Sequence, residues 1–303
     1  MRIYDELKKM VPVRLKRAIR RAMTPKEERD RDAQLGLFIL DQAESFSRHI
    51  GGQPESLTAV LESIAHLESL TAVNEAHQYL QTALMPEFEK NLYEYYRQQE
   101  YLILLTFLSY PFRGPGSLTL EPFLRGAKKL GTLRILDYGA GLAFGIIHLL
   151  RTCPEAVESI TTVDLDLIHS RLAAYIVSTM APGKDCRHYM LRDAEEQPSF
   201  ADRKFNCLFG DNVFEHLREP ERVLRSMLQR AEETSICYFD LADHGRKYLQ
   251  HVHPQLSHLE EIMTEFSFVR TEKVGGVMEY VRGLPPRKST TSLTNSKPTW
   301  ILG

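Results

Sequence analysis

The chain has little cysteine and no apolar stretch long enough to cross a membrane. Its 303 residues include only four cysteines, which are far apart and form no C-x-x-C pair, so neither a disulfide framework nor a zinc site is predicted. The longest apolar run, YLILLTFLSYPF, is shorter than the about 20 residues of a membrane span. No apolar segment follows the charges at the N-terminus, so no signal peptide is expected, and a reducing, cytoplasmic compartment is the default expectation.

The chain also lacks a strong excess of charge of either sign. Its formal net charge is −2, so nothing global predicts a nucleic-acid partner. Residues 1–23 are the local exception, with eight basic and two acidic residues, and a helix there would align Leu15, Ile19 and Met23 on one face. This segment either contacts a membrane surface or a partner protein, or is a solvated arm packed by its apolar seam. The narrowness of the seam favours the solvated arm.

Two regions of different character follow this basic segment. With 43% apolar and 26% charged residues, the composition is that of an ordinary soluble globular protein with enough material for a core. From 24 to 129 the apolar residues recur with the period of amphipathic helices. From 130 onward short apolar runs alternate with helical stretches, which predicts βαβ units around a parallel sheet.

The second region has a predictable order of elements. Its expected strands are 133–138, 159–165, 188–191, 205–210 and 234–239. Its expected helices are 144–151, 168–180 and 220–233. Two final strands are joined by Gly275 and Gly276, a two-residue turn typical of an antiparallel hairpin. We therefore predict a helical subdomain over 1–129, an α/β domain over 130–284 and a flexible tail over 285–303.

A glycine-rich turn follows the first expected strand, in the segment RILDYGAGLAFGI. Ligands of open parallel sheets bind at the carboxyl ends of the strands, so a nucleotide is expected at this turn. A dinucleotide site requires G-x-G-x-x-G, whereas Gly139, Gly141 and Gly145 are spaced G-x-G-x-x-x-G. Asp137 precedes the glycines, and its carboxylate would repel a pyrophosphate but suits a ligand with a cationic amine. For Gly145 we predict only close packing of the following helix.

Acidic residues also end the later strands. Asp164 falls at the end of the second strand, where a carboxylate can accept hydrogen bonds from both hydroxyls of a ribose, and Leu165 can lie against a flat base. Asp166 is expected to cap the following helix. After the third strand, Asp193 can accept a hydrogen bond from the exocyclic amine of adenine, and Asp211 ends the fourth strand opposite the glycine turn.

The segments ILDYGAGLAFG, TVDLD and RDAEEQPSFADRKFNCLFGDNVFEHLREPERVL together resemble class I S-adenosylmethionine-dependent methyltransferases. The last segment is similar to the small-molecule methyltransferases that carry "EH" after the fourth strand. Each motif alone is weak, but their order and strand-length spacing over about 130 to 282 make the resemblance strong. It implies a doubly wound, mostly parallel, seven-stranded Rossmann-like sheet with an antiparallel C-terminal hairpin.

The resemblance implies S-adenosylmethionine as the cofactor and gives roles to the residues that match the motifs. Toward the methionine portion it places Asp137, Gly139, Gly141, Asp211 and Asn212; on the ribose Asp164; and toward the adenine Leu165, Asp193 and Ala194. The sulfonium and the ammonium of this cofactor carry positive charge, which nearby carboxylates offset. The fourth-strand region lacks the N-P-P-[YF] motif of members that methylate exocyclic or amide nitrogens, which argues against DNA and protein-amide acceptors.

Histidine is the first candidate for a general base, which is needed only where the acceptor must lose a proton. His216 follows Glu215 in FEHL, where it either starts a helix within a polar pair or faces the pocket. His244 follows the fifth strand, and His251 and His253 stand in QHVHP. We expect one of His244, His251 and His253 to line the pocket or act as a base. The catalytic candidates are therefore His216, His244 and His253, and His251 is placed on the substrate side. A metal held by these histidines and nearby aspartates is disfavoured, because no second cluster supports it.

The helical subdomain is expected to cover the carboxyl edge of the sheet and to set acceptor choice. Its expected acceptor contacts are Tyr93, Tyr96, Tyr110 and Arg113, although such tyrosines are more often core residues and a loop arginine is more often solvated. We expect an enzyme, a methyltransferase that transfers a methyl group to oxygen or nitrogen of a small-molecule metabolite.

Three alternatives remain open at this point. The first is a methyltransferase for a macromolecule or a lipid-linked glycan, docked through residues 1–23. The second is a non-catalytic partner protein that binds the cofactor and organises a complex. The third is a nicotinamide enzyme, which ranks last because of the glycine spacing and Asp137.

Overall fold

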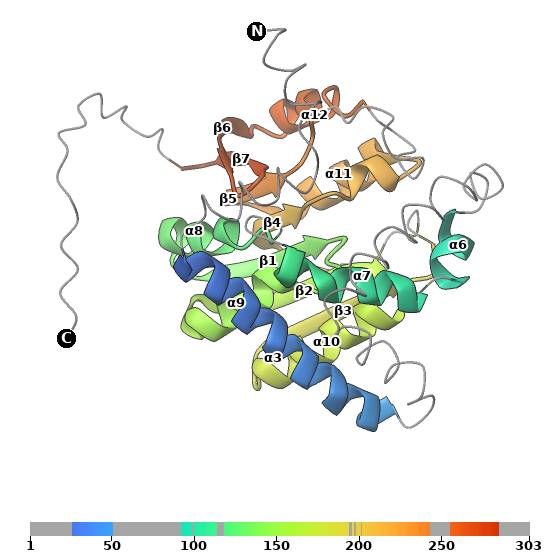
Figure 1. The fold of residues 1–303 in the computed structure, drawn as a ribbon. Coiled ribbons are helices and arrows are strands. Elements are labelled where there is room, and N and C mark those ends of the chain that lie inside the picture. Colours follow the sequence, from blue (N-terminus) through green and yellow to red (C-terminus); the bar gives the residue numbers. More distant parts are fainter. Residues whose placement is uncertain are drawn as a thin grey trace, which may run out of the picture.

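The computed structural model describes residues 26–50, 92–98, 100–113, 118–193, 196, 198–200, 202–242 and 255–284. Its centre is a seven-stranded sheet in the order β3-β2-β1-β4-β5-β7-β6 (Figure 1). The strands are β1 (Leu133–Tyr138), β2 (Val157–Leu165), β3 (Asp185–Leu191), β4 (Phe205–Gly210), β5 (Ala231–Phe239), β6 (Val269–Val274) and β7 (Val277–Arg282). The helices are α3 (Lys26–Ile50), α6 (Leu92–Gln98), α7 (Glu100–Arg113), α8 (Glu121–Leu130), α9 (Phe144–Thr152), α10 (Ile168–Met180), α11 (Pro220–Leu228) and α12 (Leu259–Glu265), with short 3₁₀ turns η1 (Pro154–Ala156) and η2 (Phe214–His216).

The sheet has the connectivity that the resemblance implies. Strands β1 to β5 pair in parallel, and β7 pairs antiparallel with both β5 and β6. Gly275 and Gly276, both with positive φ, form the turn between β6 and β7. The chain builds outward from β1 to β3 and then crosses to β4 on the other side of β1. This reversal opens a crevice between the carboxyl ends of β1 and β4, where ligands of such sheets bind.

Apolar faces on both sides of the sheet hold the helices in place. One core cluster joins the sheet to α8, α9 and α10 and includes Ile146 and Ile176, whereas the other joins it to α11 and α12 and includes Val223 and Leu259. Several element boundaries differ from expectation: β2, β3 and β5 begin two or three residues earlier, and α11 ends at Leu228 rather than at 233. Periodicity does not mark these starts because exposed and half-buried residues such as Glu158 and Arg187 alternate there with the apolar ones.

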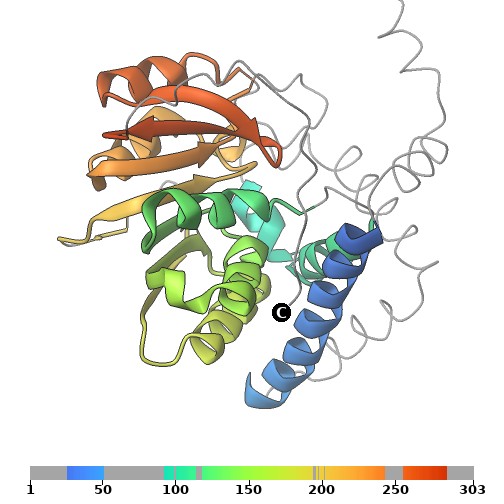
Figure 2. The same ribbon diagram turned by 90° about the vertical axis from the view of Figure 1, so that its left-hand side faces the viewer.

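The described N-terminal helices share the core of the α/β region. Leu35, Ile39, Ala43 and Phe46 form one buried stripe along α3 and belong to the same cluster as α9 and α10. Figure 2 shows α3 on the outer side of the helical layer, away from the strands. Helix α7 lies between this layer and the carboxyl edge of the sheet, so it is placed to reach a ligand there.

The start of α10 corrects one expectation. Asp166 does not cap this helix; its Oδ1 instead accepts a hydrogen bond from Arg171 Nε at 2.8 Å, which lowers the pKa of Asp166. The N–H of Ile168 donates to Glu100 Oε2 at 3.1 Å. A side chain of α7 thus satisfies the helix end, a contact that the local sequence of α10 does not contain.

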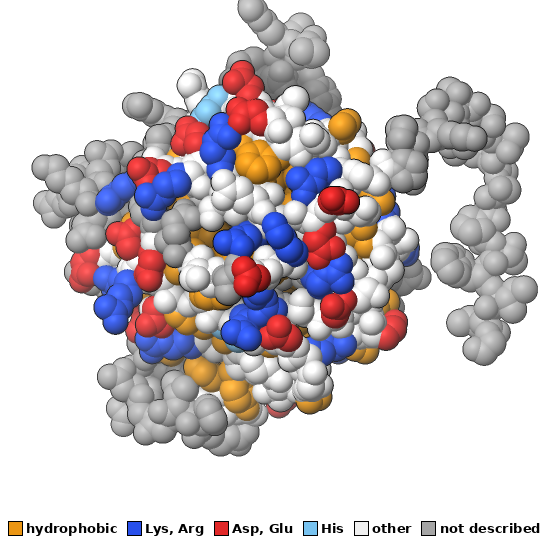
Figure 3. All heavy atoms as spheres, turned by 180° about the vertical axis from the view of Figure 1, so that it is seen from behind, with side chains coloured by type: hydrophobic (Ala, Val, Ile, Leu, Met, Phe, Trp, Pro, Cys, Tyr) orange, Lys and Arg blue, Asp and Glu red, His pale blue; other side chains and the backbone are white. Residues whose placement is uncertain are grey.

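The charged side chains and the cysteines of the described residues agree with the composition of the sequence. Seen from behind, lysine and arginine side chains lie beside aspartate and glutamate over the coloured face (Figure 3). All four cysteines are free, and burial raises the pKa of Cys207 and Cys237. Among the described residues, no helix combines the length and the apolar character that a bilayer crossing requires.

Candidate functional site

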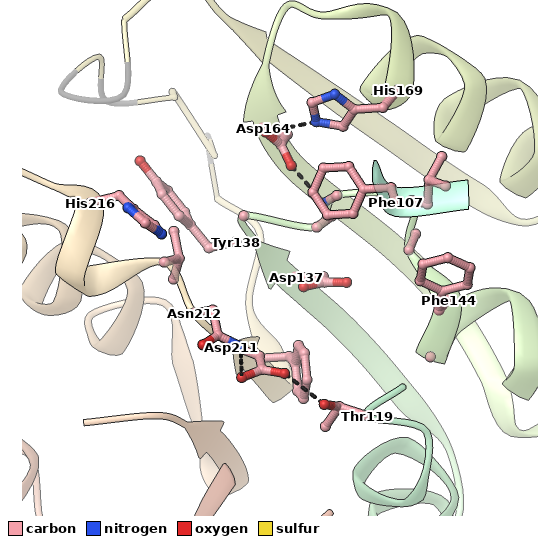
Figure 4. Close-up of a pocket in the computed structure, with 18 of the residues that line it drawn as sticks. Phe107, Thr119, Asp137, Tyr138, Phe144, Asp164, His169, Asp211, Asn212 and His216 are labelled. Carbon is pink, nitrogen blue, oxygen red and sulfur yellow. Dashed lines mark hydrogen bonds and ion pairs between the residues drawn. The ribbon is translucent and has the colours of Figure 1, made fainter. Parts of the chain in front are cut away.

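A cavity of about 660 Å³ lies at the carboxyl edge of the sheet, at the crossing between β1 and β4. Its described walls come from the turn after β1, the ends of β2, β4 and β5, helices α6 and α7, and the segment before α8. Figure 4 shows side chains from the ends of β1 and β2, from the segment after β4, from α7 and from the segment before α8 converging on one space. The volume is in the range of sites that enclose a small organic ligand.

Neighbouring strands each bring an aspartate to this cavity. Asp164 and Asp137 lie near the ends of β2 and β1, Asp211 follows β4 and Asp240 follows β5, and all four line the cavity. These strands are adjacent in the order β2-β1-β4-β5, so the carboxylates form a row along the edge, which we call the aspartate row. Such a row makes the potential negative and favours a cationic ligand.

Asp137 is the most deeply buried member of the aspartate row. It is 3% exposed, and its Oδ1 has no hydrogen-bond partner among the described residues. Burial, with Asp164 and Asp211 nearby, raises the pKa of this carboxyl group well above its usual range. Figure 4 shows the group in the middle of the cavity-lining side chains. A buried carboxylate without a partner is costly, and an ammonium group of a ligand would remove this cost.

The glycine turn brings backbone close to the same space. Gly139 and Gly141 have φ of +72° and +55°, and a Cβ on Gly139 would lie 2.6 Å from Val213 Cγ2, so a side chain is excluded there. Gly145 lies in α9, where a Cβ would come within 2.4 Å of the Phe123 ring. The predicted close packing at Gly145 is confirmed, and Gly145 also lines the cavity.

Asp164 ties this turn to the end of β2. Its Oδ2 accepts from the N–H of Gly141 at 2.6 Å, and its Oδ1 accepts from the N–H of Leu165 at 2.7 Å. Nε2 of His169 lies 3.7 Å from the same Oδ1. Phe107 of α7 packs against the His169 ring, with centroids 4.8 Å apart, and closes this side of the cavity (Figure 4).

The opposite side of the cavity is built by the segment after β4. Both oxygens of Asp211 are engaged, because Thr119 Oγ1 donates to Oδ2 at 2.6 Å and Asn212 Nδ2 donates to Oδ1 at 2.8 Å. Glu215 in η2 is 1% exposed, and its Oε2 has no hydrogen-bond partner among the described residues. Its Oε1 lies 3.9 Å from His216 Nε2. Burial raises the pKa of Glu215 to about 7, and Asp240 and Asp211 add to the shift.

The structure brings most of the predicted site residues together at this cavity. Those that line it are Asp137, Gly139, Gly141, Asp164, Leu165, Asp211, Asn212, His216, Tyr93, Tyr96 and Tyr110. Asp193 is half-buried after β3 and is not among the lining residues. Ala194, His244, His251 and His253 lie outside the described residues, as does the side chain of Arg113. Within the described chain, no group of three or more histidine, cysteine or acidic side chains is arranged to hold a metal ion.

Several lining residues were not predicted as site residues. Phe107, Thr119 and His169 reach the cavity from three different elements, and no local motif marks them. Glu215 had a usable signal, since it precedes His216 directly after the fourth strand, but the sequence does not reveal its burial.

No protein-family model matches the chain, and no curated protein does. Solved structures with a similar fold include a SAM-dependent methyltransferase from Aquifex aeolicus, 18% identical, with 55% of this chain and 92% of that chain covered and a TM-score of 0.41. The pyocyanin biosynthetic protein PhzM is 12% identical, with 69% of this chain and 70% of that chain covered and a TM-score of 0.45. The [4+2]-cyclase SpnF is 18% identical, with 50% of this chain and 58% of that chain covered and a TM-score of 0.39. At such identities the similarity is one of fold.

Proposed function

We propose that this chain, whose seven-stranded sheet ends in an antiparallel hairpin, binds S-adenosylmethionine in the cavity and transfers its methyl group to a small-molecule acceptor. The observation that carries the proposal is Asp137, a buried carboxylate in the cavity with an oxygen that no described residue satisfies. A ligand with an ammonium group supplies the missing donor and the compensating charge.

The aspartate row favours this cofactor over a dinucleotide. Burial raises the pKa of Asp137, and repulsion from Asp164 and Asp211 raises it further, so the negative charge of a pyrophosphate between these groups would be unfavourable. A sulfonium and an ammonium instead offset the charge of the row.

The lining residues fit the parts of the cofactor in order along the sheet edge. Asp137 would hold the ammonium group, and the turn at Gly139 and Gly141, which lines the cavity, would present its backbone to the methionine portion. Asp164 accepts one N–H on each oxygen, and since each carboxylate oxygen accepts more than one hydrogen bond, ribose hydroxyls can still be bound. Leu165 would lie against the adenine.

The protein's part in the reaction is alignment and exclusion of water. The bound cofactor supplies a methyl carbon already activated by the sulfonium. The walls formed by α6 and α7, including Tyr93, Tyr96 and Tyr110, would hold the acceptor against that carbon. Alignment of this kind supplies about 7–11 kcal/mol of the barrier reduction in well-oriented reactions.

Replacing Asp164 by alanine is expected to weaken S-adenosylhomocysteine binding about 10-fold or more, because the ribose loses its acceptors and the Gly141 N–H loses its partner. Isothermal titration calorimetry measures this change. Asp166→Ala is the matched control, since Asp166 lies two residues further on and pairs with Arg171. Equal affinities in wild type and Asp164→Ala, or equal losses in both variants, would contradict the assignment.

The activity itself is tested with a metabolite extract from cells that contain the protein. Incubation with trideuteromethyl-labelled cofactor is expected to give S-adenosylhomocysteine and a small molecule that carries the labelled methyl group, both detected by mass spectrometry. Failure of the purified chain to bind S-adenosylhomocysteine in calorimetry would overturn the proposed function.

A further inference from the structure

Glu215 is a buried carboxylate that the proposed cofactor site does not use. It lines the cavity from η2, is 1% exposed, and keeps Oε2 without a partner among the described residues. Buried carboxylate oxygens are almost always hydrogen-bonded, so such an oxygen marks the place of a missing donor. Glu215 lies on the β4 and β5 side of the cavity, beyond Asp137.

The charges around Glu215 restrict what this donor can be. Burial raises the pKa of Glu215, and the negative charges of Asp240 after β5 and Asp211 after β4 raise it further. The described lining residues include carboxylates on β1, β2 and η2 and directly after β4 and β5, but no lysine or arginine. The basic side chain beside Glu215 is His216, whose Nε2 lies 3.9 Å from Oε1, so Oε2 is the oxygen left for a ligand donor. An anionic acceptor would add to the repulsion, and a hydroxyl group would leave the charge uncompensated. A protonated amine both donates a hydrogen bond and offsets the charge.

We propose that the acceptor is an amine whose nitrogen is bound against Glu215, and that Glu215 takes the proton that this nitrogen must lose. The proposal rests on the proposed function and names the acceptor class of the same site.

The step balances with groups already named. The N–H of the bound ammonium donates to Oε2 of Glu215, and its proton passes to that oxygen, which leaves a lone pair on the nitrogen. The lone pair forms the new N–C bond to the methyl carbon as the C–S bond breaks, and the C–S electron pair stays on sulfur as a thioether. The product is the N-methylated ammonium, and Glu215 returns its proton to solvent when the product leaves.

The raised pKa of Glu215, about 7, agrees with this role. A proton acceptor works best when its pKa is close to the working pH, because both protonation states are then accessible. The shift comes first from burial, then from Asp240 and Asp211, whereas a hydrogen bond from the backbone of Glu215 acts in the opposite direction.

The test compares matched amines and alcohols on protein saturated with S-adenosylhomocysteine. Benzylamine against benzyl alcohol, and 2-phenylethylamine against 2-phenylethanol, differ only in the polar group, and calorimetry gives each affinity. We expect wild type to bind an amine about 10-fold more tightly than its alcohol. Glu215→Gln is expected to lose this preference while its affinity for S-adenosylhomocysteine stays within about twofold of wild type. Glu219→Gln, an exposed neighbour, is the control and should keep the preference.

The outcomes separate the two proposals. Absence of an amine preference in wild type, including absence of binding by the whole panel, overturns the inference while S-adenosylhomocysteine binding still supports the cofactor site. A preference that persists in Glu215→Gln overturns it as well. Failure of wild type to bind S-adenosylhomocysteine overturns the proposed function.

A measurement on wild type alone covers the case in which Glu215→Gln fails to fold. The amines stay protonated near neutral pH, so their affinity should fall as the pH is lowered through about 7, where Glu215 becomes neutral. Constant amine affinity across this range would overturn the inference.

Discussion

Asp137→Asn is expected to weaken S-adenosylhomocysteine binding about 100-fold, which corresponds to about 2.7 kcal/mol. The substitution keeps the shape of the side chain but removes the charge that the ligand ammonium is proposed to meet in a buried site. Removing one member of a buried charge pair costs about 2–5 kcal/mol, so the estimate lies at the lower end. Calorimetry measures the change, and an affinity within about threefold of wild type would contradict the assignment of Asp137.

The same substitution is expected to stabilise the ligand-free protein in a pH-dependent way. The pKa of Asp137 is raised in the folded chain, so below the usual aspartate pKa the group is neutral in both states and costs nothing. As the pH rises above that value, the unfolded chain releases the proton while the folded chain keeps it, and wild-type stability falls by up to about 1.4 kcal/mol per pH unit.

Thermal unfolding of wild type and Asp137→Asn across this range measures the effect. The free energy of unfolding of Asp137→Asn should exceed that of wild type by an amount that grows with pH. This excess should level off above the pKa that Asp137 has in the folded chain. Asp166→Asn should instead be less stable than wild type as the pH rises, because the hydrogen bond from Arg171 lowers the pKa of Asp166 in the folded chain. Parallel curves for wild type and Asp137→Asn would show that Asp137 is not held at a raised pKa.

Gly145→Ala is expected to destabilise the protein by about 1–3 kcal/mol, the usual cost of overpacking a core. The new Cβ would lie 2.4 Å from two carbons of the Phe123 ring and 3.2 Å from the carbonyl oxygen of Thr119. Phe123 is 1% exposed and packs against Phe209, with ring centroids 4.7 Å apart, so the ring has little room to move. Phe123 and Thr119 also line the cavity, and we expect ligand affinity to fall together with stability.

Gly126→Ala is the matched control in the neighbouring helix α8. A Cβ there would make ordinary contacts of 3.5 to 3.7 Å with Cys207, Leu133 and Tyr238. Since the substitution removes a flexible glycine from a helix, we expect a gain of about 0.5–1 kcal/mol. Urea denaturation of both variants distinguishes steric overlap from a general effect of changing a helical glycine, and equal shifts would contradict the packing argument.

The glycine turn and the strand ends were predictable because local sequence determines them. Each aspartate of the row stands at or near the end of a short apolar run, and parallel strands bring their carboxyl ends to one edge. The bounds of α10 were predicted, but the partner of its first N–H was not, because the acceptor of the Ile168 N–H is Glu100 on α7. Phe107 and Thr119 were missed for the same reason: their place at the cavity depends on how α7 and α8 pack, which no local pattern records.

Glu215 shows a second reason why sequence alone does not identify every site residue. The sequence shows an acidic residue beside a histidine, and attention falls on the histidine because its usual pKa suits proton transfer. Burial raises the pKa of Glu215 to about 7, which makes the glutamate a candidate for proton transfer as well. This burial depends on the whole cavity wall and is not visible in the local sequence.

The aspartate row has a consequence for turnover. Methyl transfer removes one positive charge from the proposed cofactor, since a sulfonium becomes a neutral thioether. The negative charge of the aspartate row does not change in this step. The attraction between site and ligand is therefore larger before the reaction than after it. A site of this kind holds the reactant more tightly than the spent product, so product inhibition is weakened and the next reactant molecule displaces the used one more easily.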